Sequence, residues 1–380
     1  MLTAMKFHGV KLPSIAHYSR HWHYVLPAAV LTTCLVVLAA MSLPGGVPLM
    51  PLAVTSTAGH GRGVNGSCDI FKGEWVPDPG APGYTNETCP VIHGHYDCMR
   101  YGKPDLGFVR WRWRPDGCEL PRFDAARFLG AMRGNGPCRG PKRDTSTATS
   151  ATASPSPFLV RAVETDRDGP TRSGAGLWSL HLDEPDAGWA AHAGMFDYIV
   201  VSAGSWFYRP SVFYERGRLV GCSGCLAPNV TDLTLRYSLR LAFRSALRAA
   251  VGAPGGRSRT VIVRTISPSH YENGTRNEDG DCVRTRPLRR GEWEMDEGQK
   301  EMRRIQVEEF AAAEAAARGK GVRMLLMDAT EAMALRPDAH PSKYRLWESE
   351  KFTVSRDCLQ WCLPGAMDAC NDMLLHMLIG

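Results

Sequence analysis

The sequence predicts an α/β protein with a parallel sheet that is covered by helices on both faces. Short apolar runs rich in β-branched residues alternate with longer segments of helical periodicity, which is the pattern of parallel strands joined by helices. The hydrophobic fraction of 44% is enough to bury a core of this kind. The strands are expected at 196–204, 259–267 and 322–328, and the helices at 231–251 and 296–318.

Each of these elements has its own local signal. The first strand ends at Gly204, and the other two read RTVIVRTIS and VRMLLMD. In the first helix the apolar residues recur near helical spacing, with Thr231 or Asn229 as the expected cap. The second helix is rich in alanine and is followed by Gly319 and Gly321. Functional loops are expected where the strands end, because ligands bind at the carboxyl ends of parallel strands.

A membrane anchor is expected at 24–43, a run of twenty residues without a charge. About twenty apolar residues cross a bilayer as a helix. The basic residues Lys6, Lys11 and Arg20 precede the run, which favours a cytoplasmic N-terminus and a type II orientation. A cleaved signal peptide is the alternative, but the run and its polar lead are long for one. Residues 44–66, rich in Gly, Pro, Ala and Thr, are expected to form a stem.

Two features place the rest of the chain in the secretory lumen. Four Asn-x-Ser/Thr acceptors predict glycosylation at Asn65, Asn86, Asn229 and Asn273. Eleven of the twelve cysteines follow the anchor, a density that suits an oxidising compartment. A zinc site is the alternative for Cys222 and Cys225, although no second pair of ligands has the required spacing.

A low-complexity segment interrupts the folded region. Residues 145–156 read TSTATSATASPS, a composition that cannot form a core. The segment from 135 to 157 is therefore expected to be a linker.

Six blocks of sequence, in this order, resemble the plant trichome birefringence-like (PC-esterase) family, and they extend over residues 68–380 except for 135–157. They are CDIFKGEWVPD from Cys68, CMRYGKPD from Cys98, WRWRPDGCELPRF from Trp111, VSAGSWF from Val201, RPDAHP from Arg336 and DCLQWCLPG from Asp357. GCSGC from Gly221 and TISPSHYE from Thr265 resemble its xyloglucan O-acetyltransferase branch.

The resemblance implies a three-layer α/β/α, esterase-like (SGNH/GDSL-like) luminal domain. It divides the chain into a cytoplasmic tail (1–23), a signal anchor (24–43), a stem (44–66), a family N-terminal region (67–134), a linker at an apparent deletion (135–157) and a PC-esterase-like domain (158–380). It also implies polysaccharide O-acetylation in the Golgi. In that chemistry a serine of a Gly-Asp-Ser motif takes acetyl from a donor, and the aspartate and histidine of Asp-x-x-His activate it.

Two of these catalytic groups are absent from the chain. Gly-Asp-Ser does not occur, and the stretch that precedes it in the family runs here into the linker. Asp357 remains as the triad acid, but Gln360 occupies the histidine position. Glutamine cannot exchange a proton near neutral pH, so it cannot act as the general base. A Ser205–His270 pair is an alternative catalytic pair that no family motif supports.

The resemblance also suggests substrate contacts and disulfides. The substrate-binding candidates are Trp206, His270, His340 and Trp361, with a structural role as the alternative for His340. The disulfide candidates are Cys68, Cys89, Cys98, Cys118, Cys222, Cys225, Cys282, Cys358 and Cys362. This number is odd, so one of them would lack a partner within the set.

The expected function is therefore acetyl transfer to a cell-wall polysaccharide, with xyloglucan as the acceptor, impaired in this chain. No bound cofactor is expected, and acetyl-CoA or a derived carrier would be the co-substrate. The Golgi membrane and proteins that supply the donor are the other expected partners. A non-catalytic glycan-binding or partner-binding relative is the alternative, and a gene product that folds poorly is a third possibility. A nucleic-acid partner is not expected, because half of the net charge of +6 lies in residues 1–23.

Overall fold

The structure is a computed structural model, and it describes most of the chain after residue 67 together with a short N-terminal strand. The described residues are 2–7, 68–132, 149–153, 158–164, 177–255, 258–276, 278–346 and 356–380. The expected anchor at 24–43 and the expected stem at 44–66 lie outside them. Among the described residues, no helix is long and apolar enough to cross a bilayer.

A five-stranded sheet with the order β11-β10-β7-β1-β4 forms the centre of the molecule. The strands β7 (Tyr198–Val201), β10 (Arg259–Arg264) and β11 (Val322–Met327) are parallel neighbours. These are the three strands that the sequence predicts, and they confirm the parallel part of the sheet.

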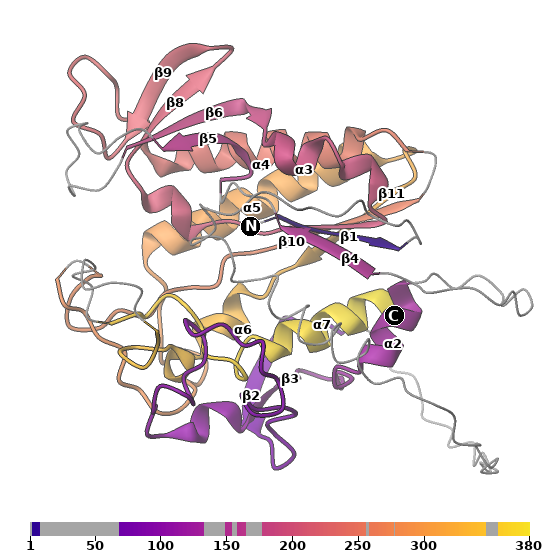
Figure 1. Ribbon diagram of the computed structural model, residues 1–380, viewed down its shortest axis with the longest axis vertical. Helices are drawn as coiled ribbons and strands as arrows, with labels where there is room; N and C mark the ends of the chain where they lie inside the picture. Colours follow the sequence, from indigo (N-terminus) through magenta and orange to yellow (C-terminus); the bar gives the residue numbers. More distant parts are fainter. Residues whose placement is uncertain are drawn as a thin grey trace, which may run out of the picture.

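Helices cover both faces of this sheet, as predicted (Figure 1). Val261 and Val263 of β10 pack in the cluster that contains α4 (Thr234–Gly252) and α5 (Glu297–Ala317). Ile262, which points to the opposite face, packs in the cluster that contains the short helix α6 and the C-terminal helix α7. The remaining helices are α2 (Ala125–Met132), α3 (Ala187–Ala190), α6 (Thr330–Ala334), α7 (Asp368–Ile379), η1 (Leu106–Val109), η2 (Ala193–Met195), η3 (Ser205–Tyr208) and η4 (Pro337–Ala339).

The other two strands of the sheet are antiparallel and were not predicted. β1 (Leu2–Phe7) pairs with β7, and β4 (Thr149–Ala153) pairs with β1. The sequence assigns these segments to the cytoplasmic tail and to the linker. Pairing along the edge of a strand uses backbone N–H and C=O groups. A segment whose side chains show no strand pattern can therefore pair with such an edge.

A second, four-stranded sheet lies against α4 on the side away from the central sheet (Figure 1). Its strands are β5 (Val160–Glu164), β6 (Trp178–Pro185), β8 (Ser211–Glu215) and β9 (Arg218–Ser223). The sequence analysis missed this sheet. Arg216 and Gly217 join β8 to β9 with positive φ angles of 50° and 71°, the conformation of a tight hairpin turn.

The N-terminal region forms loops and a two-stranded antiparallel sheet. β2 (Gly73–Pro77) pairs with β3 (Trp111–Pro115), and the rings of Trp75 and Trp113 meet edge to face at 5.7 Å. The indole N–H of Trp75 donates to the carbonyl of Ala332 in α6 at 2.8 Å. This region therefore packs directly against the esterase-like domain.

A buried ion pair joins the two regions. Arg336 and Asp338 are both fully buried, and Nε of Arg336 donates to Asp338 Oδ1 at 2.8 Å. The guanidinium also lies over the ring of Trp75 at 4.3 Å and donates to the carbonyl of Phe108 at 2.5 Å. One arginine from the esterase-like domain thus contacts two segments of the N-terminal region.

We expect Arg336→Met to destabilise the fold by about 3–5 kcal/mol, because it leaves the carboxylate of Asp338 buried without a counter-charge. The double variant Arg336→Met/Asp338→Leu should recover most of that loss. Urea unfolding midpoints of the three proteins measure both effects. Equal destabilisation in the single and double variants would show that the loss of stability does not come from leaving the Asp338 carboxylate without its counter-charge.

Candidate functional site

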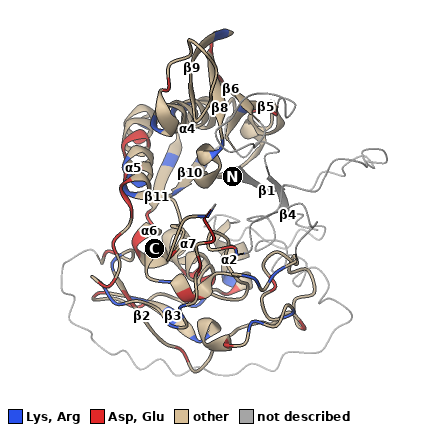
Figure 2. Ribbon diagram, turned by 90° about the vertical axis from the view of Figure 1, so that its left-hand side faces the viewer, with Lys and Arg blue, Asp and Glu red and all other residues tan. Residues whose placement is uncertain are grey.

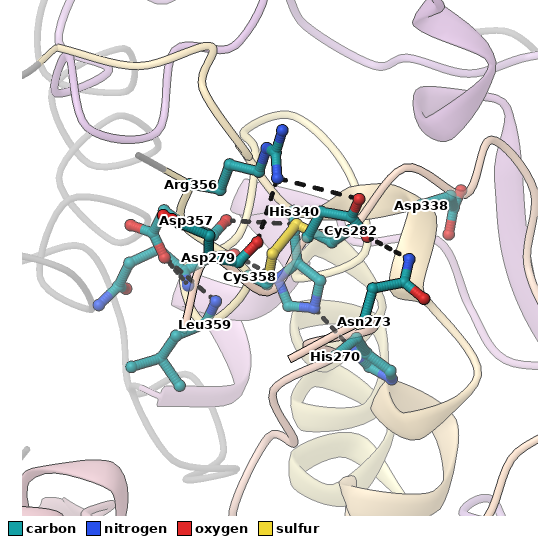
Figure 3. Close-up of a disulfide and its surroundings, with 12 residues drawn as sticks. His270, Asn273, Asp279, Cys282, Asp338, His340, Arg356, Asp357, Cys358 and Leu359 are labelled. Carbon is teal, nitrogen blue, oxygen red and sulfur yellow. Dashed lines mark hydrogen bonds and ion pairs between the residues drawn. A yellow bond between two sulfur atoms is a disulfide. The ribbon is translucent and has the colours of Figure 1, made fainter. Parts of the chain in front are cut away.

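The turn at 357–362, which carries the expected catalytic motif, is attached to the fold at both ends. At its start, Ser342 and Asp357 exchange two backbone hydrogen bonds of 2.9 and 3.0 Å. A disulfide joins Cys358 to Cys282 (Figure 3), and another joins Cys362 to Cys98. The position of this turn is therefore fixed by covalent bonds as well as by hydrogen bonds.

Asp357 holds the turn through its own side chain. Its Oδ1 accepts hydrogen bonds from the backbone N–H groups of Leu359, at 3.1 Å, and Gln360, at 2.9 Å. Its Oδ2 pairs with the guanidinium of Arg345. The carboxylate is almost completely buried and its charge is compensated, so its role in this structure is to shape the turn.

Gln360 follows in the same turn and is half-buried. Its backbone carbonyl accepts a hydrogen bond from Nδ1 of His340 at 2.6 Å. The structure thus brings Asp357 and Gln360 together as predicted, in a turn that folds without a basic group at position 360.

His270 and His340 form a buried pair. Both side chains have no exposed surface, and Nδ1 of His270 lies 2.7 Å from Nε2 of His340 (Figure 3). Burial lowers the pKa of His270 to about 4, and burial together with the neighbouring His270 lowers the pKa of His340 well below its ordinary value. Because a side chain without exposed surface cannot contact a glycan, the expectation that these residues bind substrate was wrong. The structural alternative for His340 holds instead.

The two tryptophan candidates differ in exposure. The ring of Trp361 is 7% exposed and is covered by His340 at 4.3 Å, so it belongs to the core and not to a substrate surface. Trp206 is half-buried on η3, directly after β7, with the guanidinium of Arg209 over its ring at 4.4 Å. Of the four predicted substrate contacts, Trp206 alone keeps a ring that a ligand can reach.

Ser205 and His270 do not form a catalytic pair. Both ring nitrogens of His270 already have partners, His340 at 2.7 Å and the carbonyl of Ala334 at 2.8 Å. The alternative nucleophile–base pair is therefore not supported.

Gln306, which the sequence analysis did not single out, ties the loops after two strands together. Its amide donates to the carbonyl of Ala203 at 2.7 Å and accepts from the N–H of Ile266 at 2.8 Å. The sequence signal for this role was a glutamine on the apolar face of the predicted helix, between Ile305 and Phe310. In the structure the side chain of Gln306 is fully buried. Polar residues on such faces are rarely buried without a specific partner.

Four disulfides pair eight of the nine predicted cysteines. They are Cys68–Cys118, Cys98–Cys362, Cys222–Cys225 and Cys282–Cys358. Cys89 is disulfide-bonded as well, so its partner lies outside the nine, and one member of the set lacks a partner within it, as the odd number predicts. The bond within Cys222-x-x-Cys225 removes the ligands of the alternative zinc site.

Three of the four glycosylation acceptors lie in described loops. Asn229 and Asn273 are exposed, and Asn86 is half-buried. Asn65 lies outside the described residues.

Comparison with known proteins connects this architecture to a family. A profile of the GDSL/SGNH-like acyl-esterase family found in Pmr5 and Cas1p matches residues 143–377, and a PMR5 N-terminal domain profile matches residues 66–119. Protein trichome birefringence-like 19 of Arabidopsis thaliana is 41% identical over 348 residues, covering 82% of this chain and 81% of that protein. The chain belongs to the trichome birefringence-like family.

Xyloglucan O-acetyltransferases also match this trichome birefringence-like protein. Xyloglucan O-acetyltransferase 1 of Arabidopsis thaliana is 34% identical over 351 residues, covering 82% of this chain and 80% of that protein. Xyloglucan O-acetyltransferase 3 of Populus trichocarpa is 33% identical over 345 residues, covering 82% and 85%. The mixed α/β fold and the disulfides agree with the esterase-like domain that the sequence predicts.

The carboxyl groups at the start of α7, directly after the turn, predict an unusual pH dependence. Asp368 accepts hydrogen bonds from the hydroxyl of Tyr84 at 3.0 Å and the N–H of Gly365 at 2.9 Å. Burial raises the pKa of Asp368 to about 6, and burial raises the pKa of Asp372 to about 6 as well. Since the folded state binds these protons more tightly than the unfolded state, their contribution to stability is present below pH 4 and is lost as the pH rises through 6.

We expect Asp368→Asn to reduce the loss of stability between pH 4 and pH 7 by on the order of 1–3 kcal/mol. Denaturant unfolding at several pH values measures the slope. The exposed residue Glu314 on α5 supplies a control, and Glu314→Gln should leave the slope unchanged. A slope in Asp368→Asn equal to that of the wild type would contradict the assignment.

Proposed function

We propose that this trichome birefringence-like protein acts in the O-acetylation of a plant cell-wall polysaccharide, with xyloglucan as the acceptor. The observation that carries the proposal is the match over most of the chain to relatives whose names include xyloglucan O-acetyltransferases. The sequence blocks of that branch, in the loop at Gly221–Cys225 and at 265–272, support it.

The reaction would be an acyl transfer in two steps. A serine oxygen attacks the carbonyl carbon of the acetyl donor, the bond to the donor's leaving group breaks, and a base removes the serine proton. A hydroxyl of the glycan then attacks the acetyl-serine ester, and the serine regains its proton. Acetyl-CoA or a carrier derived from it would supply the acetyl group, and proteins that deliver the donor would be partners.

We further propose that this chain is impaired in that reaction as written. It lacks Gly-Asp-Ser, and Gln360 cannot take the serine proton. The match to trichome birefringence-like 19 extends over 348 positions, more than the 82% of the 380-residue chain that takes part in it. The relative therefore has residues within the match that have no counterpart here, in keeping with a missing segment.

Restoring a Gly-Asp-Ser segment between Gly134 and Pro157 tests this proposal. Intact-mass spectrometry after incubation with an acetyl donor should show little acetyl-enzyme for the restored chain with Gln360. The rate of adduct formation should rise by several orders of magnitude when Gln360→His is added, since loss of a triad base has effects of that size. Abundant adduct with Gln360 in place would show that this position is not essential.

A binding function without catalysis is the second candidate, and one observation favours it. The turn at 357–362 is held by two disulfides, Asp357 and His340, none of which depends on a base at position 360. Under this alternative the purified luminal part would unfold cooperatively and bind xyloglucan oligosaccharides. Broad unfolding without binding would exclude it and favour a chain that folds poorly.

For the localisation we propose a single-pass type II protein of the Golgi membrane, anchored by 24–43, with the esterase-like domain in the lumen. The exposed acceptors Asn229 and Asn273 support a luminal domain. One crossing at 24–43 would place residues 2–7 and β7 on opposite sides of the membrane. The β1–β7 pairing of the structure and the anchored topology therefore exclude each other in one molecule.

An acceptor sequence Asn-Gly-Thr added before Met1 distinguishes the two arrangements. The type II topology predicts that the added site stays unmodified while Asn229 and Asn273 are glycosylated in the same molecules. Glycosidase-induced mobility shifts of single-site variants measure this. Modification of the added site would contradict the type II topology.

A nucleic-acid partner is not part of the proposal. Figure 2 shows acidic and basic residues side by side on α5. Arg240 of α4 pairs with Glu308 and Glu309 of α5, and Arg244 pairs with Glu309. Charges paired in this way do not form the basic face that binding to phosphates requires.

A further inference from the structure

A continuous chain of hydrogen bonds runs through the two buried histidines. Nε2 of His270 lies 2.8 Å from the carbonyl oxygen of Ala334. Nδ1 of His270 lies 2.7 Å from Nε2 of His340. Nδ1 of His340 lies 2.6 Å from the carbonyl oxygen of Gln360. All three distances are short enough for hydrogen bonds, so each requires one proton between its two atoms.

The two neutral rings do not have enough protons for this chain. A carbonyl oxygen only accepts, so the first bond needs a proton on Nε2 of His270 and the last needs a proton on Nδ1 of His340. A neutral imidazole carries one N–H, so these two bonds use both protons of a neutral pair. The remaining nitrogens, Nδ1 of His270 and Nε2 of His340, would then face each other at 2.7 Å with a lone pair each.

We propose that His270 and His340 are positioning residues that bind one additional proton between their rings and thereby fix the turn that carries position 360. With this proton, all three hydrogen bonds form at once, and the carbonyl of Gln360 is tied through both rings to the carbonyl of Ala334. Without it, one of the three bonds is open and the hold on the turn is weaker.

The charges around the pair place this proton uptake below neutral pH. Lys103 donates to the carbonyl oxygens of Asp338, at 2.9 Å, and His340, at 2.6 Å, and its positive charge opposes a second cation. Arg336 also opposes it, whereas the carboxylate of Asp338 favours it but is paired with Arg336.

The charged groups on the remaining sides of the histidine pair are themselves paired with a residue of opposite charge. Arg284, from the loop beyond β10, opposes the charge on His270 and is paired with Glu272. Asp357, in the turn itself, is paired with Arg345. Burial and these cations together place the uptake below the ordinary imidazole pKa of about 6.5.

The hydrogen bonds that hold the turn are expected to strengthen as the pH falls. In the neutral range the pair is uncharged and the hydrogen-bond chain is incomplete. As the pH falls, the pair takes up the proton and the turn becomes more rigid. The N–H groups of Leu359 and Gln360, which donate to Asp357, report on that rigidity.

The test follows ring nitrogens and turn amides in the purified protein from pH 7.5 to about pH 3, beyond the pKa of about 4 that burial gives His270. The ¹⁵N shifts of the histidine rings should show two protonated nitrogens on the pair at high pH and three in acid. Amide hydrogen exchange at Leu359 and Gln360, corrected for intrinsic rates, should slow several-fold over the same pH range. Unfolding before the pair takes up a proton, or rings that stay neutral throughout, would contradict the proposal.

His270→Gln provides the matched variant. A glutamine amide nitrogen carries two N–H groups and can donate to the carbonyl of Ala334 and to Nε2 of His340 without an additional proton. The exchange of the turn amides should then be slow and independent of pH. If that variant does not fold, His340→Gln serves the same purpose. His192→Gln, at an exposed histidine, should retain the wild-type response.

A pH response of the turn amides that is equal in wild type and His270→Gln would overturn the proposal. The inference rests on the proposed function only in treating position 360 as the place of the family's catalytic histidine. Ring protonation and amide exchange are measured without acetyl transfer, so either proposal can fail while the other stands.

Discussion

The buried Arg336–Asp338 pair is the interaction on which the rest of the structure depends. On one side, the guanidinium of Arg336 contacts the N-terminal region through the ring of Trp75 and the carbonyl of Phe108. On the other side, Arg336 and Asp338 lie at the start of the segment that leads to His340. Lys103 donates hydrogen bonds to the carbonyls of both Asp338 and His340. Two regions far apart in the sequence are thereby fixed to one another. A fully desolvated charge pair tolerates little displacement, since separation would leave each charge unpaired in the core.

Backbone hydrogen bonds and disulfides, together with the carboxylate of Asp357, shape the turn at 357–362. The N–H of Cys362 donates to the carbonyl of Ala339 at 2.8 Å, and the N–H of His270 donates to the carbonyl of Cys358 at 2.9 Å. The disulfides to Cys98 and Cys282 add covalent links to the N-terminal region and to the loop beyond β10. The turn is therefore fixed in position although the side chain at position 360 is not a base.

The sequence predicted the parts of the fold that have a strong local signal. The three parallel strands and the helices α4 and α5 lie where periodicity placed them, within a few residues. The cap of α4 was predicted wrongly: the N-cap residue is Leu233, which makes no side-chain cap hydrogen bond, and the N–H of Thr234 donates to the side chain of Asp232 at 2.8 Å. The second sheet was missed because its short strands are stabilised by packing on α4, which no local pattern reveals. The antiparallel strand β1 was missed because it depends on an available edge of β7.

The candidate site was predicted in its position but only partly in its chemistry. The motif singled out Asp357 and Gln360, and the structure places both in one turn. Motif spacing could not indicate that His270 and His340 face each other, since they are 70 residues apart in the chain. Their burial is a tertiary property, and it removes them from any substrate surface.

We propose that the chain retains the turn that carries position 360 but lacks the serine and the histidine that would transfer acetyl. The most direct test is to incubate the unmodified protein with an acetyl donor and xyloglucan oligosaccharides and to weigh the products by mass spectrometry. We expect no acetylated oligosaccharide above the level of a protein-free control, and protein-dependent acetylation would contradict this proposal.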